Sequence, residues 1–160
     1  MSIVTVKRKV LAKNDEIAAL NRERLARHGG FAVNLVSSPG SGKTSIVERT
    51  LEYLTGKVRI AVIEGDVQTD LDAQRVARFD VPVVQIVTNG ACHLEAKLVQ
   101  DALDRLALDG VRLLIIENVG NLVCPSAAGY SNRSTRLLPL PPSTERIRSG
   151  TTTIISWLRG

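Results

Sequence analysis

The chain has 160 residues, of which 44% are hydrophobic and 23% are charged. This length and balance predict one soluble globular domain with a core of ordinary size. No run approaches the ~18 consecutive apolar residues of a membrane span, and the N-terminus lacks a signal-peptide pattern, so we expect a cytoplasmic protein with no membrane partner. The two cysteines are too few for a disulfide-stapled secreted scaffold.

The net charge of +5 is concentrated near the C-terminus. Residues 1–124 contain 16 basic and 15 acidic residues, whereas residues 125–160 contain five arginines and one glutamate. Aromatic residues make up 3% of the chain, so stacking platforms for bases are scarce. We therefore expect no nucleic-acid partner.

Apolar periodicity predicts alternating helices and strands along most of the chain. In chain order we expect a helix over 11–28, a strand over 31–36, a helix over 43–54, a strand over 58–63, a turn over 64–66, a helix beginning near 69, a strand over 81–87, a helix over 93–106 and a strand over 113–116. Strands that are apolar throughout, separated by amphipathic helices, indicate a parallel sheet covered on both faces. The predicted fold class is therefore three-layer α/β/α.

After residue 125 the composition becomes rich in Pro, Ser and Arg, and only residues 152–157 suggest another strand. We expect three parts: an N-terminal extension and helix (1–30), a partial nucleotide-binding domain (31–125) and an irregular basic tail (126–160). The abrupt change in composition predicts a domain that is incomplete at its C-terminus, from a truncated or frame-shifted reading.

The sequence Ser37-Ser-Pro-Gly-Ser-Gly-Lys-Thr44 lies between a predicted strand and a predicted helix. It matches the phosphate-loop pattern Gly-x-x-x-x-Gly-Lys-Ser/Thr, except that Ser37 replaces the first glycine. Backbone N–H groups of such a loop cradle phosphates, which makes the predicted nucleotide-binding residues Gly40, Ser41, Gly42, Lys43, Thr44 and Ser45. Lys43 is expected to reach the β- and γ-phosphate oxygens, and the Thr44 hydroxyl to hold Mg²⁺. A plain glycine-rich turn is the weaker alternative.

Acidic residues follow two predicted strands, in Glu64-Gly-Asp66 and in Glu117-Asn-Val-Gly120. The carboxyl ends of parallel strands face the ligand in open α/β sheets, so a carboxylate there can hold Mg²⁺ or orient the attacking water. We assign Asp66 and Glu117 to Mg²⁺ binding and, together with Lys43, to catalysis. Helix capping is the alternative role for such acids, and it is at least as good for Asp70 and Asp72.

Cys92, His93 and Cys124 form a third group of chemically active residues. Both cysteines follow strands that we expect to be neighbours, so the three side chains can converge at the edge that carries the phosphate loop. Thiolate and imidazole suit Zn²⁺ or Ni²⁺, but three ligands leave a tetrahedral shell incomplete, so a water or a second subunit must contribute. On spacing alone, two inert cysteines and a capping histidine are the better interpretation.

Four motifs, in this order, resemble those of the hydrogenase nickel-incorporation GTPases, the HypB family. They are Asn34–Thr44, Ile63–Asp66 followed by Thr69-Asp70, Ala91–Leu94 and Ile116–Pro125. The resemblance implies a P-loop GTPase with Mg²⁺ as cofactor, switch regions at Asp66 and Glu117–Gly120, and a Zn²⁺ or Ni²⁺ site at Cys92, His93 and Cys124, commonly at a nucleotide-dependent dimer interface. It also implies the partners: GTP, a second copy of the chain, a nickel-handling accessory protein and a hydrogenase precursor.

The resemblance predicts an active GTPase that couples hydrolysis to nickel delivery in hydrogenase maturation, and two alternatives stay open. The urease accessory GTPases share the phosphate loop but usually carry Cys-Pro-His and Glu-Ser-Gly-Gly, where this chain has Cys92-His93 and Glu117–Gly120. The Asn-Lys-x-Asp loop that reads guanine in the family occurs nowhere in the 160 residues, so weak base discrimination is expected. The second alternative is therefore a non-catalytic remnant that binds only metal or phosphate.

Overall fold

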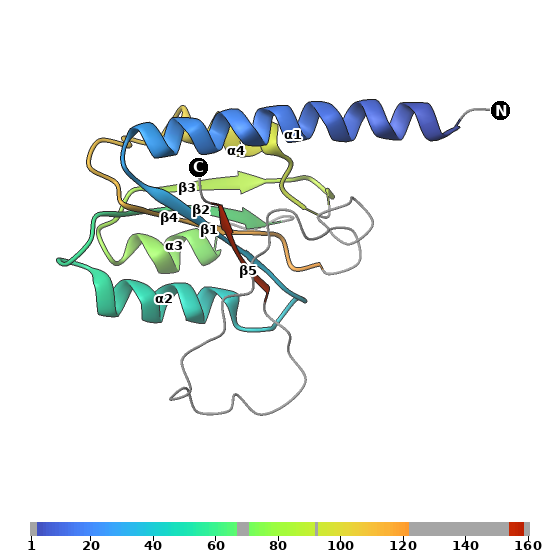
Figure 1. Cartoon of the computed structure of the whole chain (residues 1–160). Coiled ribbons are helices and arrows are strands. Elements are labelled where there is room, and N and C mark those ends of the chain that lie inside the picture. The colour runs from blue at the N-terminus through green and yellow to red at the C-terminus, as the bar shows by residue number, and fades with distance from the viewer. Residues whose placement is uncertain (1–2, 67–70, 92, 122–153, 159–160) are drawn as a thin grey trace, which may run out of the picture.

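The computed structural model describes residues 3–66, 71–91, 93–121 and 154–158. Its helices are α1 (Ile3–Arg27), α2 (Lys43–Leu54), α3 (Leu71–Ala77) and α4 (Ala96–Leu103). Its strands are β1 (Phe31–Val36), β2 (Ile60–Asp66), β3 (Val83–Val87), β4 (Leu113–Glu117) and β5 (Ile154–Leu158). The strands form one sheet in the order β3-β2-β4-β1-β5 (Figure 1).

Strands β1 to β4 run parallel, and β5 runs antiparallel to β1. Helices α1 and α4 cover one face of the sheet, while α2 and α3 cover the other (Figure 1). Successive residues of β2 alternate between the two cores: Ala61 and Ile63 pack in the core under α1 and α4, and Val62 packs in the core under α2 and α3. The predicted three-layer α/β/α class is confirmed.

Helix α1 begins at Ile3, well before the predicted start at residue 11. No glycine or proline interrupts residues 3–28, so nothing stops the helix from extending toward the N-terminus. Asn14 lies within the helix, where its Oδ1 accepts a hydrogen bond from the Ala96 N–H at 2.8 Å. This contact joins α1 to the first residue of α4.

The predicted turn at residues 64–66 is wrong, because these residues are the last three of β2. Both neighbouring strands continue the ladder: Glu64 lies opposite Glu117 of β4, and Asp66 lies opposite Val87 of β3. Backbone groups that would have turned into solvent are paired in the sheet instead. The extension places two glutamates side by side on adjacent strands.

The predicted helix over 93–106 is also too long, because α4 begins only at Ala96. Glu95 has extended backbone angles, and the Leu94 N–H donates to the Asn118 side chain at 2.9 Å, so the chain approaches the helix in an extended conformation. His93 therefore lies before the helix, whose N-cap residue is Glu95. The other elements begin within two residues of their predicted starts.

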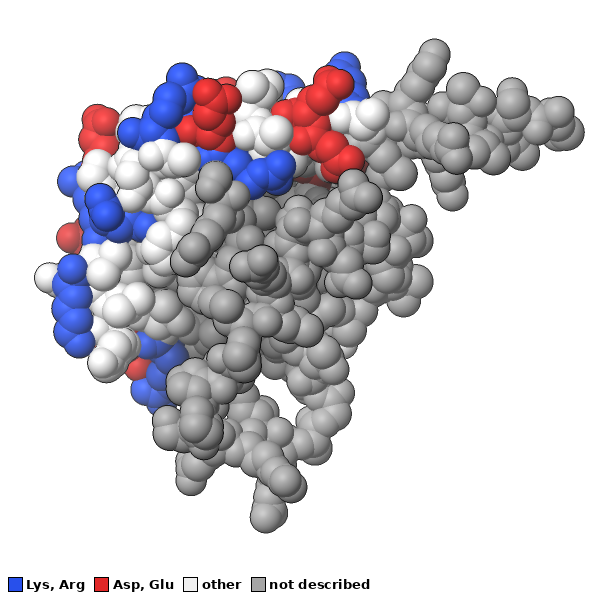
Figure 2. All heavy atoms as spheres, viewed as in Figure 1, with Lys and Arg blue, Asp and Glu red and all other residues white. Residues whose placement is uncertain are grey.

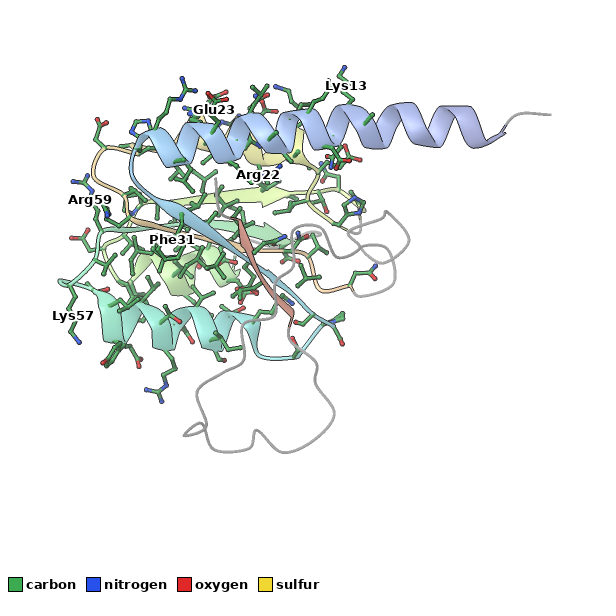
Figure 3. The ribbon with its side chains drawn as sticks, viewed as in Figure 1. Lys13, Arg22, Glu23, Phe31, Lys57 and Arg59 are labelled. Atoms are coloured by element: carbon green, nitrogen blue, oxygen red, sulfur yellow. The ribbon has the colours of Figure 1, made fainter. Side chains whose placement is uncertain are left out.

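Charged side chains of both signs are mixed over the described part of the surface seen in Figure 2. Lys57 and Arg59 lie at the end of the sheet where α2 finishes, far from the loop at which α2 begins (Figure 3). Within the residues that the structure describes, no helix has the length and apolar character needed to cross a bilayer.

Candidate functional site: a phosphate loop beside buried carboxylates

The loop between β1 and α2 (Ser37–Thr44, the phosphate loop) has a backbone that depends on glycine. Gly40 and Gly42 have φ angles of 70° and 87°, which residues with a Cβ rarely adopt. A Cβ at either position would meet nothing within 4 Å, so glycine serves the backbone conformation there and not close packing. Gly42 is the N-cap of α2, and the Ile46 N–H donates to its carbonyl at 3.0 Å. The first-turn N–H groups of α2 supply the donors that an anion at this helix end uses.

Ser37 stands where the phosphate-loop pattern has its first glycine, and it is completely buried. Its Oγ forms a hydrogen bond with the Oγ of Ser41 across the loop. The hydroxyl thus links the two sides of the loop, which explains how the pattern tolerates serine at this position.

Lys43 and Thr44 begin α2, and both are 7% exposed. The Thr44 Oγ1 donates a hydrogen bond to Glu117 Oε1 at the end of β4, at 2.9 Å. The Lys43 ammonium lowers the pKa of both Glu64 and Glu117, although burial outweighs it in each case. The fold therefore brings together Lys43, Thr44 and Glu117, which the sequence predicted as members of one site.

Glu64 and Glu117 (the carboxyl pair) are 1% and 4% exposed and lie opposite each other on β2 and β4. Burial, reinforced by the charge of Glu117, raises the pKa of Glu64 to about 9. Burial also raises the pKa of Glu117, against the opposing hydrogen bond from Thr44 and the charge of Lys43. The carboxyl pair therefore retains a proton at neutral pH.

Each member of the carboxyl pair has one buried oxygen, Glu64 Oε1 or Glu117 Oε2, with no hydrogen-bond partner among the described residues. The proton that the pair retains forms a hydrogen bond between the two carboxyl groups, and a bound cation can take the place of that proton. Carboxylate oxygens next to a threonine hydroxyl and a phosphate loop are the donor set that Mg²⁺ prefers. The residues present thus fit a magnesium ion.

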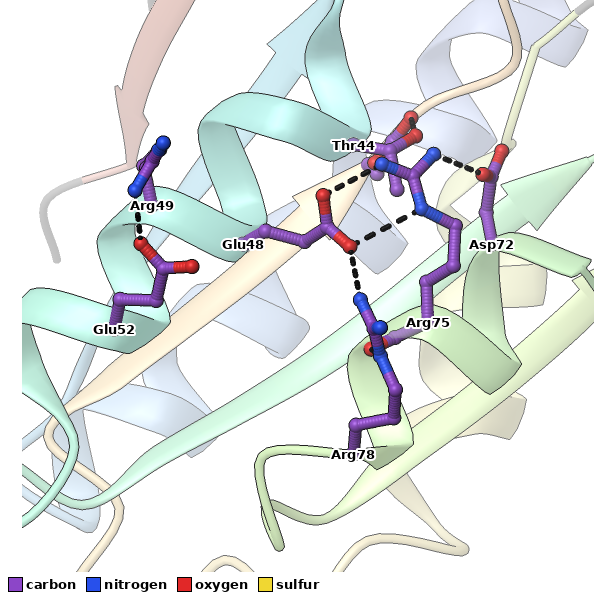
Figure 4. A network of polar contacts seen from close by, with 8 residues as sticks. Thr44, Glu48, Arg49, Glu52, Asp72, Arg75 and Arg78 are labelled. Atoms are coloured by element: carbon purple, nitrogen blue, oxygen red, sulfur yellow. Dashed lines mark hydrogen bonds and ion pairs between the residues drawn. The ribbon is translucent and has the colours of Figure 1, made fainter.

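An ion-pair network holds α2 against α3 next to this site (Figure 4). Arg75 donates to both oxygens of Glu48, at 2.5 and 3.1 Å, and to Asp72 at 3.2 Å. Arg78 adds a further bond to Glu48 at 2.7 Å. Asp72 lies in the first turn of α3, and its charge raises the pKa of both members of the carboxyl pair, so the network reaches the site electrostatically.

Comparison with known proteins agrees with this geometry. A family model described as "CobW/HypB/UreG, nucleotide-binding domain" matches residues 31–136. The chain is 54% identical over 126 residues to hydrogenase maturation factor HypB of Azotobacter vinelandii, and 50% identical over 118 residues to that of Escherichia coli K12. The chain belongs to the CobW/HypB/UreG nucleotide-binding domain family. These alignments cover 78% and 74% of the chain but only 41% of either relative, so the chain spans about two fifths of the length of these HypB proteins.

Two solved HypB structures share the fold. The crystal structure of HypB from Helicobacter pylori in complex with nickel has a TM-score of 0.66 and 47% identity, and the match covers 71% of this chain and 54% of that one. HypB from Archaeoglobus fulgidus has a TM-score of 0.63 and 42% identity, with 71% and 55% covered.

Sequence reasoning chose Asp66 over Glu64 for the HypB-type site, and the structure gives Glu64 the central place. Asp66 is partly buried at the last position of β2, opposite Val87 of β3, whereas Glu64 lies opposite Glu117. A signal for Glu64 was present: Ile-Glu ends two apolar runs, at Ile63-Glu64 and Ile116-Glu117. The role of Asp66 in Mg²⁺ binding and catalysis stays a prediction.

Asn118 is a buried site residue that the sequence did not reveal. Its Oδ1 accepts hydrogen bonds from the Leu94 N–H at 2.9 Å and the Val119 N–H at 3.0 Å. Its Nδ2 donates to Asn34 Oδ1 of β1 at 3.3 Å. One side chain therefore joins the end of β4 to β1 and to the segment that begins with His93.

The predicted metal ligands Cys92 and Cys124 lie outside the described residues, and only His93 of this group is described. Among the described residues, no three His, Cys, Asp or Glu side chains are grouped as metal ligands. The expectation that the cysteines follow neighbouring strands is wrong, because β2 lies between β3 and β4. A Zn²⁺ or Ni²⁺ site at these three residues stays a prediction.

Proposed function

We propose that this chain binds GTP with Mg²⁺ at the phosphate loop, hydrolyses it, and couples hydrolysis to nickel delivery in hydrogenase maturation. The observation that carries the proposal is the hydrogen bond from Thr44 to Glu117, formed beside the buried Lys43 and an unsatisfied carboxylate oxygen. A glycine-rich turn with a structural role would not need a buried lysine and two buried acids at its end.

The chain's own residues divide the work. The phosphate-loop N–H groups and the α2 N-terminus bind phosphate oxygens, and Lys43 neutralises charge on the β- and γ-phosphates. Thr44 and the carboxyl pair would hold Mg²⁺. When bound, this ion neutralises the charge that develops on the transferred phosphoryl group. Asp66 is assigned to orienting the attacking water, at the end of β2 that faces the same edge of the sheet.

Nickel is proposed as cargo, held by Cys92, His93 and Cys124. Support comes from the similar Helicobacter pylori HypB, whose structure is described as a complex with nickel. Since three ligands leave the shell open, we propose that two copies of the chain close it, with an accessory protein and a hydrogenase precursor as further partners. Urease is a second candidate client, because a 46% identical relative from Helicobacter pylori is named hydrogenase/urease maturation factor HypB.

Calorimetry of the full chain with non-hydrolysable GTP and ATP analogues in Mg²⁺ tests nucleotide binding, and phosphate release tests turnover. Lys43→Ala should weaken analogue binding by about 10- to 100-fold, because it removes a charge-assisted contact to phosphate. Lys57→Ala is the matched control: Lys57 lies 3.9 Å above the Tyr53 ring, at the far end of α2 (Figure 3). Equal affinities in Lys43→Ala and Lys57→Ala would count against the phosphate site.

The same titrations show whether the chain discriminates between guanine and adenine nucleotides. With no Asn-Lys-x-Asp loop in the sequence, we expect similar affinities for the GTP and ATP analogues. A strong preference for the guanine analogue would mean that another segment of the chain reads the base. Binding without turnover would favour the non-catalytic alternative.

Zinc and nickel titrations of the unaltered chain, Cys92→Ser and Cys124→Ser test the metal site, with mass followed by light scattering. Each serine variant should bind more weakly, and binding should weaken as the pH falls through the histidine range, because all three ligands must be deprotonated. Asp109→Asn, at an exposed acid, is the control. Identical stoichiometry and affinity in all four proteins would remove the three residues from the proposal.

A further inference from the structure

Gln85 extends the row of polar side chains that contains the carboxyl pair. It lies on β3 opposite Glu64 of β2, and Glu64 lies opposite Glu117 of β4. Val62 and Val83, two residues before Glu64 and Gln85, pack in the core under α2 and α3. Because side chains two residues apart share one face of a strand, the row of Gln85, Glu64 and Glu117 lies on the face that α2 and α3 cover. Helix α2 begins with the last residues of the phosphate loop.

The side-chain amide of Gln85 is poorly paired. Its Oε1 is buried and has no hydrogen-bond partner among the described residues, and its Nε2 donates one long bond, to the Ile86 carbonyl at 3.4 Å. Burying an amide in this state costs free energy. Gln85 is also the only polar residue of β3, whose other four residues are valine or isoleucine. An apolar side chain would stabilise the strand more, which points to a role of the amide other than packing.

The two members of the carboxyl pair differ in the donors around them. Glu117 accepts a hydrogen bond from the Thr44 hydroxyl at 2.9 Å. Among the described residues, the hydrogen-bond partner of the Glu64 side chain is Glu117 itself. A cation bound between the two carboxylates takes the place of this bond and leaves Glu64 without a donor. Carboxylates that bind metals usually accept a further hydrogen bond, which fixes their orientation.

We propose that Gln85 is a positioning residue for the magnesium site, and that its Nε2–H donates to the Glu64 carboxylate when the carboxyl pair holds Mg²⁺. Half a turn of the amide about the Cγ–Cδ bond exchanges Nε2 and Oε1, and the bond that it gives up, to the Ile86 carbonyl, is long. Gln85 acts through Glu64 and not by contact with the nucleotide. The inference rests on the proposed function, because it requires Mg²⁺ to bind at the carboxyl pair.

The first test measures the affinity of the full chain for a fluorescent, non-hydrolysable GTP analogue as Mg²⁺ is added to a solution that starts in EDTA. In the unaltered chain Mg²⁺ should raise this affinity. Gln85→Met keeps the length of the side chain but has no donor. The Mg²⁺ concentration that gives half of the gain should therefore rise by about 10- to 100-fold, the usual effect of losing the hydrogen-bond partner of a metal ligand.

Two controls belong to the same titration. The affinity of Gln85→Met for the analogue in EDTA should equal that of the unaltered chain, because the phosphate loop is intact. Gln100→Met makes the same change on α4, which covers the opposite face of the sheet (Figure 1), and should leave the Mg²⁺ midpoint unchanged. A rise of the midpoint in both variants would overturn the inference.

Urea unfolding in EDTA separates a positioning role from a structural one. Gln85→Met removes a buried oxygen that has no partner, so without Mg²⁺ the variant should be at least as stable as the unaltered chain. With the analogue and a fixed, subsaturating Mg²⁺ concentration, the variant should gain less stability than the unaltered chain does. A variant that is less stable in EDTA would show that the amide supports the strand itself, and the inference would be wrong.

Nuclear magnetic resonance of the unaltered chain gives a readout that does not depend on the folding of a variant. The chain has four glutamines, so ¹⁵N labelling of their side-chain amides gives a simple spectrum, in which the signal of Gln85 is the one missing from Gln85→Met. Adding Mg²⁺ to the chain with the analogue bound should shift this signal and slow its exchange with water. The signal of Gln100 should not move. No change at Gln85 overturns the inference.

The proposed function and the role of Gln85 fail in different ways. If Mg²⁺ raises the affinity for the analogue with the same midpoint in the unaltered chain and in Gln85→Met, the role of Gln85 is wrong and the proposed function stands. If Mg²⁺ leaves the affinity of the unaltered chain unchanged, the magnesium site of the proposed function fails, and the role of Gln85 fails with it.

Discussion

Glu48 is part of helix α2 and Glu64 lies on β2 within reach of the charge of Lys43 at the start of that helix, but their surroundings move their pKa values in opposite directions. Glu48 lies between α2 and α3, where hydrogen bonds from Arg75, opposed by partial burial and helped by the charge of Arg78, hold its pKa below the ordinary value. Glu64 lies at the end of β2 opposite Glu117, and burial raises its pKa to about 9. The fold places two arginines beside Glu48, whereas it places a second carboxyl group, that of Glu117, beside Glu64.

This difference separates a structural carboxylate from a ligand-binding one. Arg75 and Arg78 donate hydrogen bonds to both oxygens of Glu48 and neutralise its charge, so this carboxylate does not need a bound cation. The carboxyl pair shares the ammonium of Lys43, and one oxygen of each member has no hydrogen-bond partner outside the pair among the described residues. Burying such groups costs free energy, and a cation brought by a ligand removes that cost.

The largest expected effect is on GTP turnover, which Glu117→Gln at the carboxyl pair should lower far more than Glu48→Gln in the ion-pair network. Glutamine keeps an oxygen for the Thr44 hydroxyl but removes the charge that Mg²⁺ requires, so GTP turnover should fall by about 100- to 1,000-fold. Glu48→Gln, the same change in the ion-pair network, should leave turnover within a few-fold. Phosphate release by both variants checks this, and equal rates would remove the distinction.

Glu64 makes the stability of the ligand-free chain depend on pH. In the folded chain its carboxyl group keeps its proton until the pH approaches 9, whereas in the unfolded chain it ionises near its ordinary value of 4.5. The stabilising contribution of the retained proton is full below pH 4.5 and is lost as the pH rises toward 9. Stability should therefore fall by about 1 kcal/mol per pH unit within that window.

Urea unfolding at several pH values between 5 and 8.5 measures this slope. Glu64→Gln should flatten it, because an amide cannot ionise. Parallel slopes in the variant and the unaltered chain would show that other groups cause the dependence.

Gly65→Ala tests how tightly the chain is packed between the members of the site. The added Cβ would lie 2.7 to 3.0 Å from three side-chain atoms of Leu94, so Leu94 must shift. Overpacking of this kind costs about 1–3 kcal/mol, which thermal unfolding would detect. Gly56→Ala is a control for backbone strain alone, since Gly56 has a φ of 81° but nothing within 4 Å of an added Cβ. A smaller loss in Gly65→Ala than in Gly56→Ala would contradict close packing at Leu94.

Arg75→Ala should have the smallest effect, a loss of about 1 kcal/mol, because a partly exposed ion-pair network contributes little. The lowered pKa of Glu48 means that its stabilisation is present above its ordinary value of 4.5 and is lost as the pH falls through its lower folded pKa. The stability difference between Arg75→Ala and the unaltered chain should therefore shrink in acid. Arg49→Ala, which breaks only the exposed pair with Glu52, serves as the control. A difference that persists in acid would contradict the role of Glu48.

The unit from β1 through the phosphate loop to α2 could be predicted because its information is local. Apolar residues, glycines and the lysine follow one another within 31–54, and the predicted limits of both elements match the structure. Asn118 could not be predicted in this way, because its role depends on hydrogen bonds to Leu94 and Asn34, which are 24 and 84 residues away in the chain.

Strand order limited the other site predictions. Glu64 was assigned to a turn because the end of β2 depends on ladders with both β3 and β4, which no local pattern encodes. The prediction that the strands before Cys92 and Cys124 are neighbours was wrong for the same reason. In the sheet, β2 lies between these two strands, β3 and β4. Composition and periodicity specify elements and layers, and side-by-side placement comes from tertiary packing.

Strand β5 pairs with β1 from Ala32↔Leu158 to Val36↔Ile154, so the strand leading into the phosphate loop finds its last partner near the end of the 160 residues. Until β5 pairs with it, β1 has an open row of N–H and C=O groups on the side away from β4. An open edge of this kind accepts strands from other molecules.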